Sequence, residues 1–585
     1  MKHTSTTALI IGAGPTGLAL GLELAAQQIP FRIVDRAKGR SDKSRALVVQ
    51  ARTLELLHRH GIARDLQKRG NRADGSTMVV AGRAVASFET EAVARLPNTA
   101  FPFQLLVSQE DTEYFLEESL GKARVAAAAE GNGKGARVGE VEWGVEARSI
   151  VQEGEGVTVV LGNGKEEEEE EEEETVRASF VIGCDGKNST VRQAAGLTFE
   201  GSSYAQDFVL ADAHVKWNDP SSRNHNRAYL CFGHGLLTVL PLKHDMVRVV
   251  AVRSSVTTKT GSKDRQELKL ADFQRHFDAE MPRELGGTLH DATWLARFYL
   301  HHRGVNRYSN EGGRIFVAGD AAHVHSPVGG QGMNTGIQDA VNLGWKLGAV
   351  ARGERPLSFL ASYHAERYPV GQKLLETTDR AFTWMSWMNP VFLWVRNLLL
   401  PWVLPRVFAD VERVRANFWE MSEFGISYRD AAGGVVGTAA EGLGKGLKIH
   451  GGDRVLDGRI RGCDDDGEEG EGEKYLLELL DARTHHLLLF SGGVVDDSEA
   501  ASEGDLHRAE TKFAENSRIA AKVHAIFAEK PNGQTGYVDV DGVLHREFGF
   551  SKPAYILVRP DGYAAHVGPL SALDDLIRWF NGPTA

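Results

Sequence analysis

A glycine-rich turn near the N-terminus constrains the fold of this chain more than any other feature. The apolar run Ala8–Ile11 is typical of a buried strand, and the pattern Gly12-x-Gly14-x-x-Gly17 follows it at once. A helix of small and apolar residues and a second apolar strand are expected next. The segment therefore predicts one β-α-β unit, the building block of an α/β fold with a parallel sheet.

The same turn has the properties of a dinucleotide site. Gly12 permits a tight turn, Gly14 lets a pyrophosphate approach the backbone, and Gly17 lets the helix pack closely on the strand. The helix N-terminus supplies free N–H groups and the positive end of a dipole. Asp35 ends the second strand, where its carboxylate can accept hydrogen bonds from ribose hydroxyls. This unit alone does not distinguish FAD from NAD.

A second glycine cluster narrows the choice of cofactor. A strand expected at residues 314–317 leads into Gly319 and Asp320, and the glycine-rich segment 329–332 then opens a long apolar helix. A carboxylate at a strand end can fix the ribityl hydroxyls of a flavin. A helix N-terminus suits the negative charge of a reduced flavin ring. The combination favours FAD.

Composition excludes several classes of protein. The chain has 585 residues, which suits two or three domains. Its three cysteines lie far apart and form no CxxC pair, so no disulfide framework or metal site is expected, and a reducing, cytoplasmic compartment is predicted. The net charge of −12 is concentrated in nine consecutive glutamates, 166–174, and in the acidic run 464–473. Such runs are usually solvated loops, and the near-neutral remainder makes a nucleic-acid partner a poor prediction.

Residues 382–408 form the most apolar segment of the chain and are rich in Trp, Phe, Leu and Val. Pro390, Arg396, Pro401 and Pro405 interrupt it, whereas a spanning helix needs about 20 predominantly apolar residues. We interpret the segment as two short buried or amphipathic helices. Peripheral membrane contact is the less favoured alternative.

A third motif, Cys-Asp-Gly-Lys-Asn-Ser-Thr-Val-Arg at residues 184–192, lies between the two glycine clusters. In this order the motifs resemble those of the class A flavoprotein aromatic hydroxylases, the group typified by para-hydroxybenzoate hydroxylase and phenol hydroxylase. The resemblance extends over about residues 7–370 and includes the segment Tyr363–Pro369 after the long helix. It is highly specific for the family and weakly specific for the substrate.

The resemblance implies an α/β architecture with a Rossmann-like FAD-binding domain, an inserted mixed β-sheet substrate domain and a C-terminal thioredoxin-like domain. Residues Ile556–Gly562 carry the likeness of the last domain. It lacks a CxxC pair, so a structural or dimer-forming role is expected. The implied divisions are residues 1–80, 100–200 and 305–380 for FAD, 80–100 and 200–305 for the substrate domain, 380–430 for a helical connection, and 430–585 for the thioredoxin-like domain.

The implied activity is that of an FAD-dependent monooxygenase that uses NAD(P)H, with NADPH favoured, and O2. A C4a-hydroperoxyflavin would hydroxylate a small phenolic or polyketide-like aromatic compound of the kind found in secondary metabolism. Epoxidation, Baeyer–Villiger oxidation and oxidative dearomatisation remain alternatives because they share the cofactor motifs. A non-catalytic binding protein on the same fold is a further alternative.

The cofactor contacts that the motifs and the resemblance imply come from all three motifs and from two positions between them. They are Gly12, Gly14, Gly17, Asp35, Arg36, Arg45, Gln109, Asp185, Gly186, Gly319, Asp320, Gly330, Gly332, Met333 and Asn334.

The catalytic residues are expected on the middle sheet. His225, Arg227 and Tyr229 alternate, so they share one face if this stretch is a strand. Arg227 could stabilise a phenolate, and His225 or Tyr229 could relay its proton. The alternative is that they are polar side chains on the solvent face of the strand. His323 and His325 flank the flavin motif but are expected to bind backbone more often than substrate.

Overall fold

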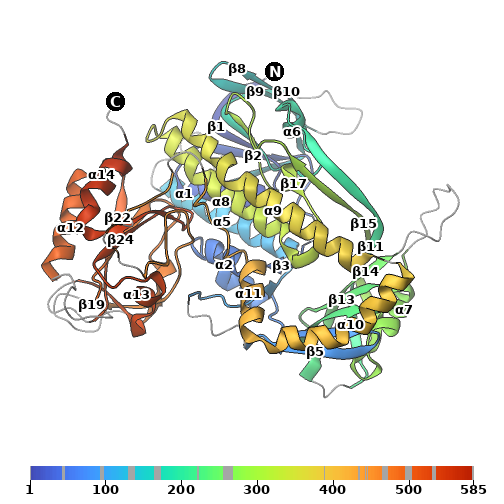
Figure 1. Cartoon of the computed structure of the whole chain (residues 1–585). Helices are drawn as coiled ribbons and strands as arrows, with labels where there is room; N and C mark the ends of the chain where they lie inside the picture. Colours follow the sequence, from blue (N-terminus) through green and yellow to red (C-terminus); the bar gives the residue numbers. More distant parts are fainter. Residues whose placement is uncertain are drawn as a thin grey trace.

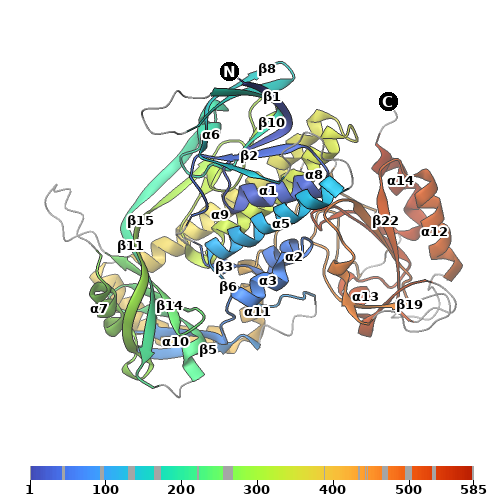
Figure 2. The same cartoon turned by 180° about the vertical axis from the view of Figure 1, so that it is seen from behind.

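The computed structural model describes residues 2–41, 46–91, 98–129, 139–163, 173–219, 223–253, 268–387, 389–431, 435–439, 441, 443, 446–463, 472–493, 503–529 and 535–582. Three large sheets covered by helices, and one two-stranded sheet, make up this part of the chain. Figures 1 and 2 show the first sheet at the top, the second sheet at the bottom and the C-terminal domain to one side, with helices α1, α5, α8 and α9 between the two sheets. The predicted α/β class, with its Rossmann-like, inserted and C-terminal parts, is confirmed.

The first sheet has the order β7-β2-β1-β10-β9-β8, and β16 pairs with β10. β1, β2, β7, β10 and β16 run parallel, whereas β9 and β8 are antiparallel. The strands are β1 (Lys2–Ile11), β2 (Phe31–Asp35), β7 (Val141–Trp143), β8 (Val145–Glu153), β9 (Gly156–Asn163), β10 (Glu173–Gly183) and β16 (Ile315–Val317). The helices around it are α1 (Pro15–Ala26), α2 (Ala51–His58), α3 (Ile62–Arg69), α5 (Gln109–Ala129), α6 (Thr190–Ala194) and α8 (Gly332–Ala351).

The second sheet has eight strands in the order β17-β15-β11-β14-β13-β12-β4-β5. They are β4 (Gly75–Val80), β5 (Arg83–Glu89), β11 (Phe199–Trp217), β12 (Arg227–Phe232), β13 (Leu236–Pro241), β14 (Met246–Arg253), β15 (Gly287–Val305) and β17 (His323–Val324). Helix α7 (Leu270–Glu280) covers one face. Helices α9 (Ala361–Ser386) and α10 (Pro390–Ala409) cover the other, and α11 (Val411–Met421) follows. A small ladder pairs β3 (Val48–Val49) with β6 (Leu105–Leu106).

The C-terminal sheet has the order β18-β25-β24-β21-β22-β23-β19-β20. Its central strands are mixed, because β21 pairs parallel with β22 and antiparallel with β24. The strands are β18 (Gly437–Thr438), β19 (Arg459–Cys463), β20 (Lys474–Tyr475), β21 (His485–Phe490), β22 (Ala521–Phe527), β23 (Gly536–Asp539), β24 (Ala554–Val558) and β25 (Ala564–Pro569). The helices are α12 (Glu503–Asn516), α13 (Val543–Phe548) and α14 (Leu573–Asn581).

Buried ion pairs join this C-terminal part to the first. Arg454 binds Glu55 of α2 through two nitrogens, and both side chains are buried. Arg52 of α2 donates to the carbonyl of Asp561 at 2.9 Å. Asp561 belongs to the segment Ile556–Gly562, which carried the resemblance of the last domain. This segment is thus part of the buried interface between the C-terminal part and the first part.

Three details differ from the sequence predictions. Strand β4 pairs with β12 and β5, so residues 75–80 belong to the second sheet and not to the first. Glu174, the last residue of the glutamate run, lies in β10 and binds Arg32 at 2.9 Å, because a buried guanidinium needs carboxylates around it. Residues 166–172 of the run lie outside the described residues. The remaining divisions between domains stay predictions.

The third difference concerns the apolar segment 382–408. The expected two short buried helices are wrong: α9 continues to Ser386, and α10 is one 20-residue helix with most of its surface exposed. Pro390 begins α10, where a missing N–H costs nothing, and Asn389 caps it. Pro401 and Pro405 lie inside the helix, and the packing of Leu400 and Leu404 on the second sheet offsets their lost hydrogen bonds. Among the described residues, α10 is the one helix long and apolar enough to cross a membrane, judged by length and composition.

Candidate active site

The turn between β1 and α1 has the close approaches that its glycines predict. Gly12 has φ +107°, and a Cβ there would lie 2.3 Å from the carbonyl oxygen of Cys184. A Cβ on Gly17 would lie 1.9 Å from the oxygen of Gly12. At Gly14, in contrast, no atom lies within 4 Å of the Cβ position, and α1 begins without a side-chain cap. The first turn of α1 therefore offers backbone donors beside open space, as a pyrophosphate site requires.

Asp35 lies at the end of β2, next to this turn. Its Oδ2 accepts a hydrogen bond from the N–H of Ala13 at 2.8 Å, and its Oδ1 accepts one from Ala37 at 2.8 Å. The carboxylate is thereby held at the rim of the glycine turn, where ribose hydroxyls are expected. Arg36 points into solvent, 3.9 Å from Glu146. The predicted cofactor contact of Arg36 has no further support from this geometry.

Gln109 begins α5 on the same side of the sheet. Its Oε1 accepts from the N–H of Ala46 at 3.2 Å, and its Nε2 donates to Glu113 at 2.8 Å. Burial, aided by the charge of Asp35, raises the pKa of Glu113 to about 7. Arg45, the other predicted contact between the motifs, lies outside the described residues.

The Asp-Gly motif follows β10 and abuts the first turn through Cys184. Asp185 accepts hydrogen bonds from the N–H groups of Thr190 and Val191, at 2.7 and 3.3 Å, at the start of α6. Burial raises the pKa of this carboxyl. Gly186 has φ +76°, which explains why glycine stands there. The motif thus closes the loop over the end of the parallel sheet.

The third motif brings Gly319 and the start of α8 against the first turn. A Cβ on either Gly319 or Gly336 would lie 2.5 Å from Oγ1 of Thr16. Asp320 is exposed at the end of β16, and Met333 is half-buried in the first turn of α8. The carboxyl ends of β1, β10 and β16 therefore meet at one place, as the switch-point rule for ligand sites in parallel sheets predicts.

Asn334 ties the start of α8 to the strand before α2. Its Oδ1 accepts from the N–H of Gln50 at 2.8 Å, and its Nδ2 donates to the carbonyls of Val48 and Gly330. Gly330 has φ +64°, and Gly332 begins the helix. Gln50 also donates to the carbonyl of Gly329 at 2.8 Å. Gln50 was missed in the sequence because a single amide outside any motif gives no signal.

Asp339 is a second residue that motif reasoning missed. It is fully buried in α8, where it accepts hydrogen bonds from Gly319 N (3.0 Å), His323 Nε2 (2.8 Å) and Arg367 Nε (2.7 Å). Burial alone would raise its pKa, but Arg367 and His323 hold the pKa below its ordinary value. An acid in the middle of an apolar helix was the available signal, since such a charge is rarely buried unless paired. His323 is therefore a positioning residue for the Gly319 loop.

His325 lies beside the start of α8. Its Nδ1 is 2.7 Å from the carbonyl oxygen of Ser326, so Nδ1 carries the proton that it donates. Its Nε2 is buried and has no partner among the described residues. It lies 3.4 Å from the position of a Cβ on Gly332. Burial lowers the pKa of His325 to about 4, so the ring is neutral near pH 7.

The second sheet has two apolar faces, and Arg227 and Tyr229 of β12 lie on the one away from these motifs. His225 lies in the 3-10 turn Arg223–Asn226 before β12, so it is not on the strand face that the alternation predicted. Tyr229 is buried in the core between the sheet and α7. Arg227 is paired with Glu89 at 2.7 Å and with Thr77 at 3.1 Å. His225 stacks on Trp217 with ring centres 5.0 Å apart. The geometry argues against the catalytic role predicted for all three, because each already has a structural partner on the α7 side.

The opposite face of the second sheet meets the flavin motif. Phe208, Phe232 and Phe298 pack there with residues of α9 and α10, and Val328 of the loop before α8 belongs to the same cluster. One polar pair lies at its edge: Tyr204 donates its hydroxyl hydrogen to Oδ1 of Asp379 at 2.5 Å. Burial, together with Asp379, raises the pKa of Tyr204. This cluster of buried side chains between the sheet, α9 and α10, here called the Phe208 face, lies next to the loop of the third motif.

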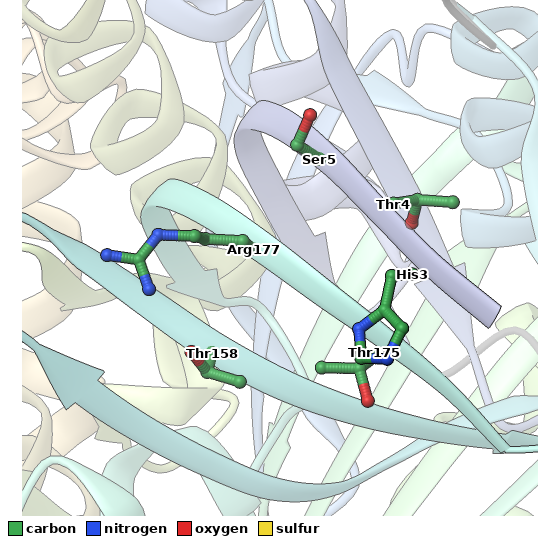
Figure 3. A pocket seen from close by; sticks show the side chains of 6 residues that line it. All are labelled: His3, Thr4, Ser5, Thr158, Thr175 and Arg177. Atoms are coloured by element: carbon green, nitrogen blue, oxygen red, sulfur yellow. The ribbon is translucent and has the colours of Figure 1, made fainter. Parts of the chain in front are cut away.

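A surface hollow of 480 Å³ lies elsewhere, on the first sheet. Figure 3 shows it lined by His3, Thr4, Ser5, Thr158, Thr175 and Arg177. Its residues lie on β1, β9 and β10 near the start of β1, whereas the glycine turn follows the end of that strand. At about 3.3 Å per residue, Ser5 and Gly12 are roughly 23 Å apart. The hollow therefore does not belong to the cofactor site.

The described residues fit a flavin dinucleotide on three counts. Gly14 leaves space before uncapped N–H groups, Asp35 is held at the rim of the same turn where it would accept ribose hydroxyls, and α8 begins without a side-chain cap directly after the loop 326–330. Residues 5–378 match the family described as "FAD binding domain", and residues 494–585 match "Phenol hydroxylase, C-terminal dimerisation domain". The chain belongs to the FAD-binding family of flavoprotein aromatic hydroxylases. It is an FAD-dependent monooxygenase, as the motifs predicted.

Some known proteins are similar to this chain over nearly its whole length. The sequence is 32% identical over 574 residues to 6-methylpretetramide 4-monooxygenase of Streptomyces rimosus, covering 97% of this chain and 92% of that protein. Among solved structures, the OxyS anhydrotetracycline hydroxylase from Streptomyces rimosus has a TM-score of 0.69 with 26% identity, covering 100% of both chains. The flavin-dependent monooxygenase PieE, solved with FAD and substrate, has a TM-score of 0.75 and covers 99% of both chains. At 20% identity it supports the fold alone.

Proposed function

We propose that this monooxygenase hydroxylates a polycyclic phenolic compound of the aromatic polyketide class, with NADPH as reductant and O2 as the source of the new oxygen atom. The observation that carries the proposal is the position of Val328. It lies in the loop that begins the flavin helix and also packs in the Phe208 face. A substrate bound on that face would be in contact with the loop that borders the flavin.

The Phe208 face suits a flat, multi-ring substrate. The rings of Phe208 and Phe298 are stacked with centres 5.8 Å apart, and Phe382 lies 5.2 Å from Phe208. Apolar and aromatic side chains with few polar groups are the usual lining of a small-molecule site. The names of the relatives support the class, because 6-methylpretetramide and anhydrotetracycline both appear among them.

Tyr204 and Asp379 supply the polar contact that orients such a substrate. Both side chains are half-buried, and their hydrogen bond of 2.5 Å holds them together at the edge of the Phe208 face. A phenolic hydroxyl of the substrate would donate to the Asp379 carboxylate, while Tyr204 holds that carboxylate in place. Partial transfer of the phenolic proton to Asp379 makes the ring carbons ortho and para to the hydroxyl more nucleophilic.

Bound FAD supplies the electrons from NADPH and the activation of O2, and the chain supplies position and charge. The N-terminus of α8 places a positive dipole end beside Gly330 and Gly332, which favours a negatively charged flavin ring. His325 is neutral there, since burial lowers its pKa to about 4. The dipole of α8, rather than a charged imidazole, is thus the stabilising group at this place.

Two further features concern the whole protein. The match of residues 494–585 to a dimerisation domain supports a homodimer formed through the C-terminal part. Among the described residues, Cys184, Cys231 and Cys463 form no disulfide, and the absence of disulfides is typical of proteins in a reducing, cytoplasmic compartment.

The proposal is tested by offering the purified holoenzyme NADPH, air and a panel of compounds. The panel holds polycyclic phenols, simple phenols, polycyclic aromatics without hydroxyl groups, and cyclic ketones. Polycyclic phenols are expected to stimulate NADPH oxidation most and to yield a product with one additional hydroxyl group. A lactone from a ketone, or an epoxide from a ring without hydroxyl groups, would instead establish one of the other flavin-dependent oxidations.

A further inference from the structure

We propose that α10 is a peripheral membrane-binding helix whose outer face lies in the headgroup region of a lipid bilayer. Its large apolar side chains project outward. Val391, Trp394, Leu398, Leu399 and Trp402 are each between 53 and 70% exposed, and Trp387, which precedes the helix, is 54% exposed. Single exposed apolar residues are normal on proteins, but a continuous row along one helix marks an interaction surface.

The inner side of α10 is fixed to the protein. Nη2 of Arg396 and Nδ2 of Asn397 both donate to the carbonyl of Gly233, at 3.1 and 3.2 Å. Phe408 stacks on Phe88 of β5 with ring centres 5.5 Å apart. Figures 1 and 2 show α10 along the outer edge of the second sheet, beside β5. The helix therefore lies flat against the sheet and cannot span a membrane while these contacts exist.

The chemistry of the outer face selects lipid as the occupant. Residues 381–409 contain no aspartate or glutamate, and Arg396 and Arg406 are the only charged residues among them. Arg396 points inward and Arg406 is exposed at the end of the helix, so the outer face carries only positive charge. Anionic lipid headgroups are attracted by such a face.

The tryptophans support the same occupant. Of the ten tryptophans in the chain, four lie at positions 384, 387, 394 and 402. All four are exposed, between 43 and 68%. Indole rings prefer the boundary between headgroups and acyl chains, because one edge can donate a hydrogen bond while the ring contacts apolar chains.

A second copy of the chain is the competing occupant. The segment that matches a dimerisation domain, residues 494–585, includes α12 and α14. Figures 1 and 2 show these helices on the far side of the molecule from α10. Self-association thus has another surface, and the outer face of α10 remains for lipid.

The test is flotation of the holoenzyme with vesicles of phosphatidylcholine mixed with phosphatidylserine, with no substrate present. The variant Trp394→Ser/Trp402→Ser removes the two most exposed indoles. Each lost indole is expected to lower the partition coefficient at least tenfold, which corresponds to about 1.4 kcal/mol of lost apolar burial. Val391→Glu is the single-charge variant. Val125→Glu is its control, because Val125 is similarly exposed (67 against 70%) on another helix, α5.

The expected result is flotation of the wild type and of Val125→Glu, with the double variant and Val391→Glu left at the bottom of the gradient at unchanged flavin content. The proposal is overturned if the wild type does not float. It is also overturned if the double variant floats as well as the wild type. Sedimentation velocity gives the third outcome: a dimer that the double variant converts to monomer, without vesicle binding by the wild type, would assign the face to a second copy.

Discussion

Arg559 of the C-terminal domain forms a bidentate ion pair with Glu366 of α9. Its Nη1 lies 2.7 Å from Oε1 and its Nη2 lies 2.8 Å from Oε2, and both side chains are fully buried. Lys346 of α8 also donates to Glu366, at 2.8 Å. Burial would raise the pKa of Glu366, but the two cations lower it to about 2. The C-terminal domain is thereby connected to α8, the helix that begins at Gly332 of the third motif.

The variant Arg559→Met tests this joint. Removing one partner leaves Glu366 and Asp561 buried with too little positive charge, so a loss of about 3–5 kcal/mol in stability is expected. The denaturant midpoint and the release of flavin fluorescence measure it. Arg578→Met is the matched control, because Arg578 pairs with Asp575 at the surface of the same domain and contributes about 0–1 kcal/mol. Equal losses of stability in Arg559→Met and Arg578→Met would show that the ion pair between Arg559 and Glu366 does not stabilise the fold.

Two glycine variants separate cofactor binding from folding. Gly14→Ala meets no protein atom within 4 Å, so the variant is expected to fold, while its methyl group occupies the approach of the pyrophosphate. Gly17→Ala would place a Cβ 1.9 Å from the oxygen of Gly12 and is expected to lose thermal stability as well. Circular dichroism and FAD titration measure the two effects. Gly121→Ala, with nothing near its Cβ position in α5, is the control. Normal FAD affinity in Gly14→Ala would contradict the assignment of this turn.

Glu423 gives stability a defined dependence on pH. It is buried against Thr335, which donates at 2.9 Å, and burial raises its pKa from 4.5 to about 8. The folded protein therefore keeps a proton that the unfolded chain releases above pH 4.5. Stability from this group is full below pH 4.5, declines as the pH rises, and is lost as the pH passes 8. In Glu423→Gln the amide cannot titrate.

The melting temperatures of the wild type and Glu423→Gln should therefore converge, or cross in favour of the variant, between pH 5 and pH 9. Glu420→Gln is the control, since Glu420 is exposed at the end of α11, and no such trend is expected there. A constant difference between the wild type and Glu423→Gln across this range would mean that Glu423 is ionised in the folded protein.

Tyr204→Phe tests the polar edge of the Phe208 face. The variant loses the hydrogen bond to Asp379, so the carboxylate is expected to hold the substrate less firmly. The yield of product per NADPH is expected to fall about tenfold, which corresponds to about 1.4 kcal/mol. Product and hydrogen peroxide are measured together. FAD content should not change, because Tyr204 does not lie in the three motifs. Tyr299→Phe, an exposed tyrosine on the neighbouring strand β15, is the matched control. Unchanged coupling in Tyr204→Phe would remove this pair from the substrate site.

The backbone geometry of the glycine turns could be predicted from the sequence because the rules for such turns are local. Gly12, Gly17 and Gly186 adopt backbone geometries or contacts that only glycine permits, and each stands within a short motif. Asp35 ends a strand whose position follows from the same unit. The buried partners of these loops were not predictable, since Asp339 meets Arg367 and His323 only after α8 and α9 have packed.

The face of the second sheet that contacts the third motif could not be predicted from the sequence. Alternation correctly placed Arg227 and Tyr229 on one face of β12, but both faces of this strand are buried, one under α7 and one beside α9 and α10. Period-2 alternation says which residues share a face and not which face meets the flavin. Likewise, the prolines of residues 390–405 suggested a broken helix. The helix is continuous instead, because Leu400 and Leu404 pack on the second sheet.

The most direct test of the central claim is the fate of molecular oxygen. The holoenzyme would be given NADPH, a polycyclic phenol that stimulates NADPH oxidation, and ¹⁸O2 in ordinary water, and the product would be analysed by mass spectrometry. The account predicts one atom of ¹⁸O in a new phenolic hydroxyl group. Oxygen derived from water, or NADPH oxidation that yields hydrogen peroxide without any oxygenated product from the entire panel, would contradict it.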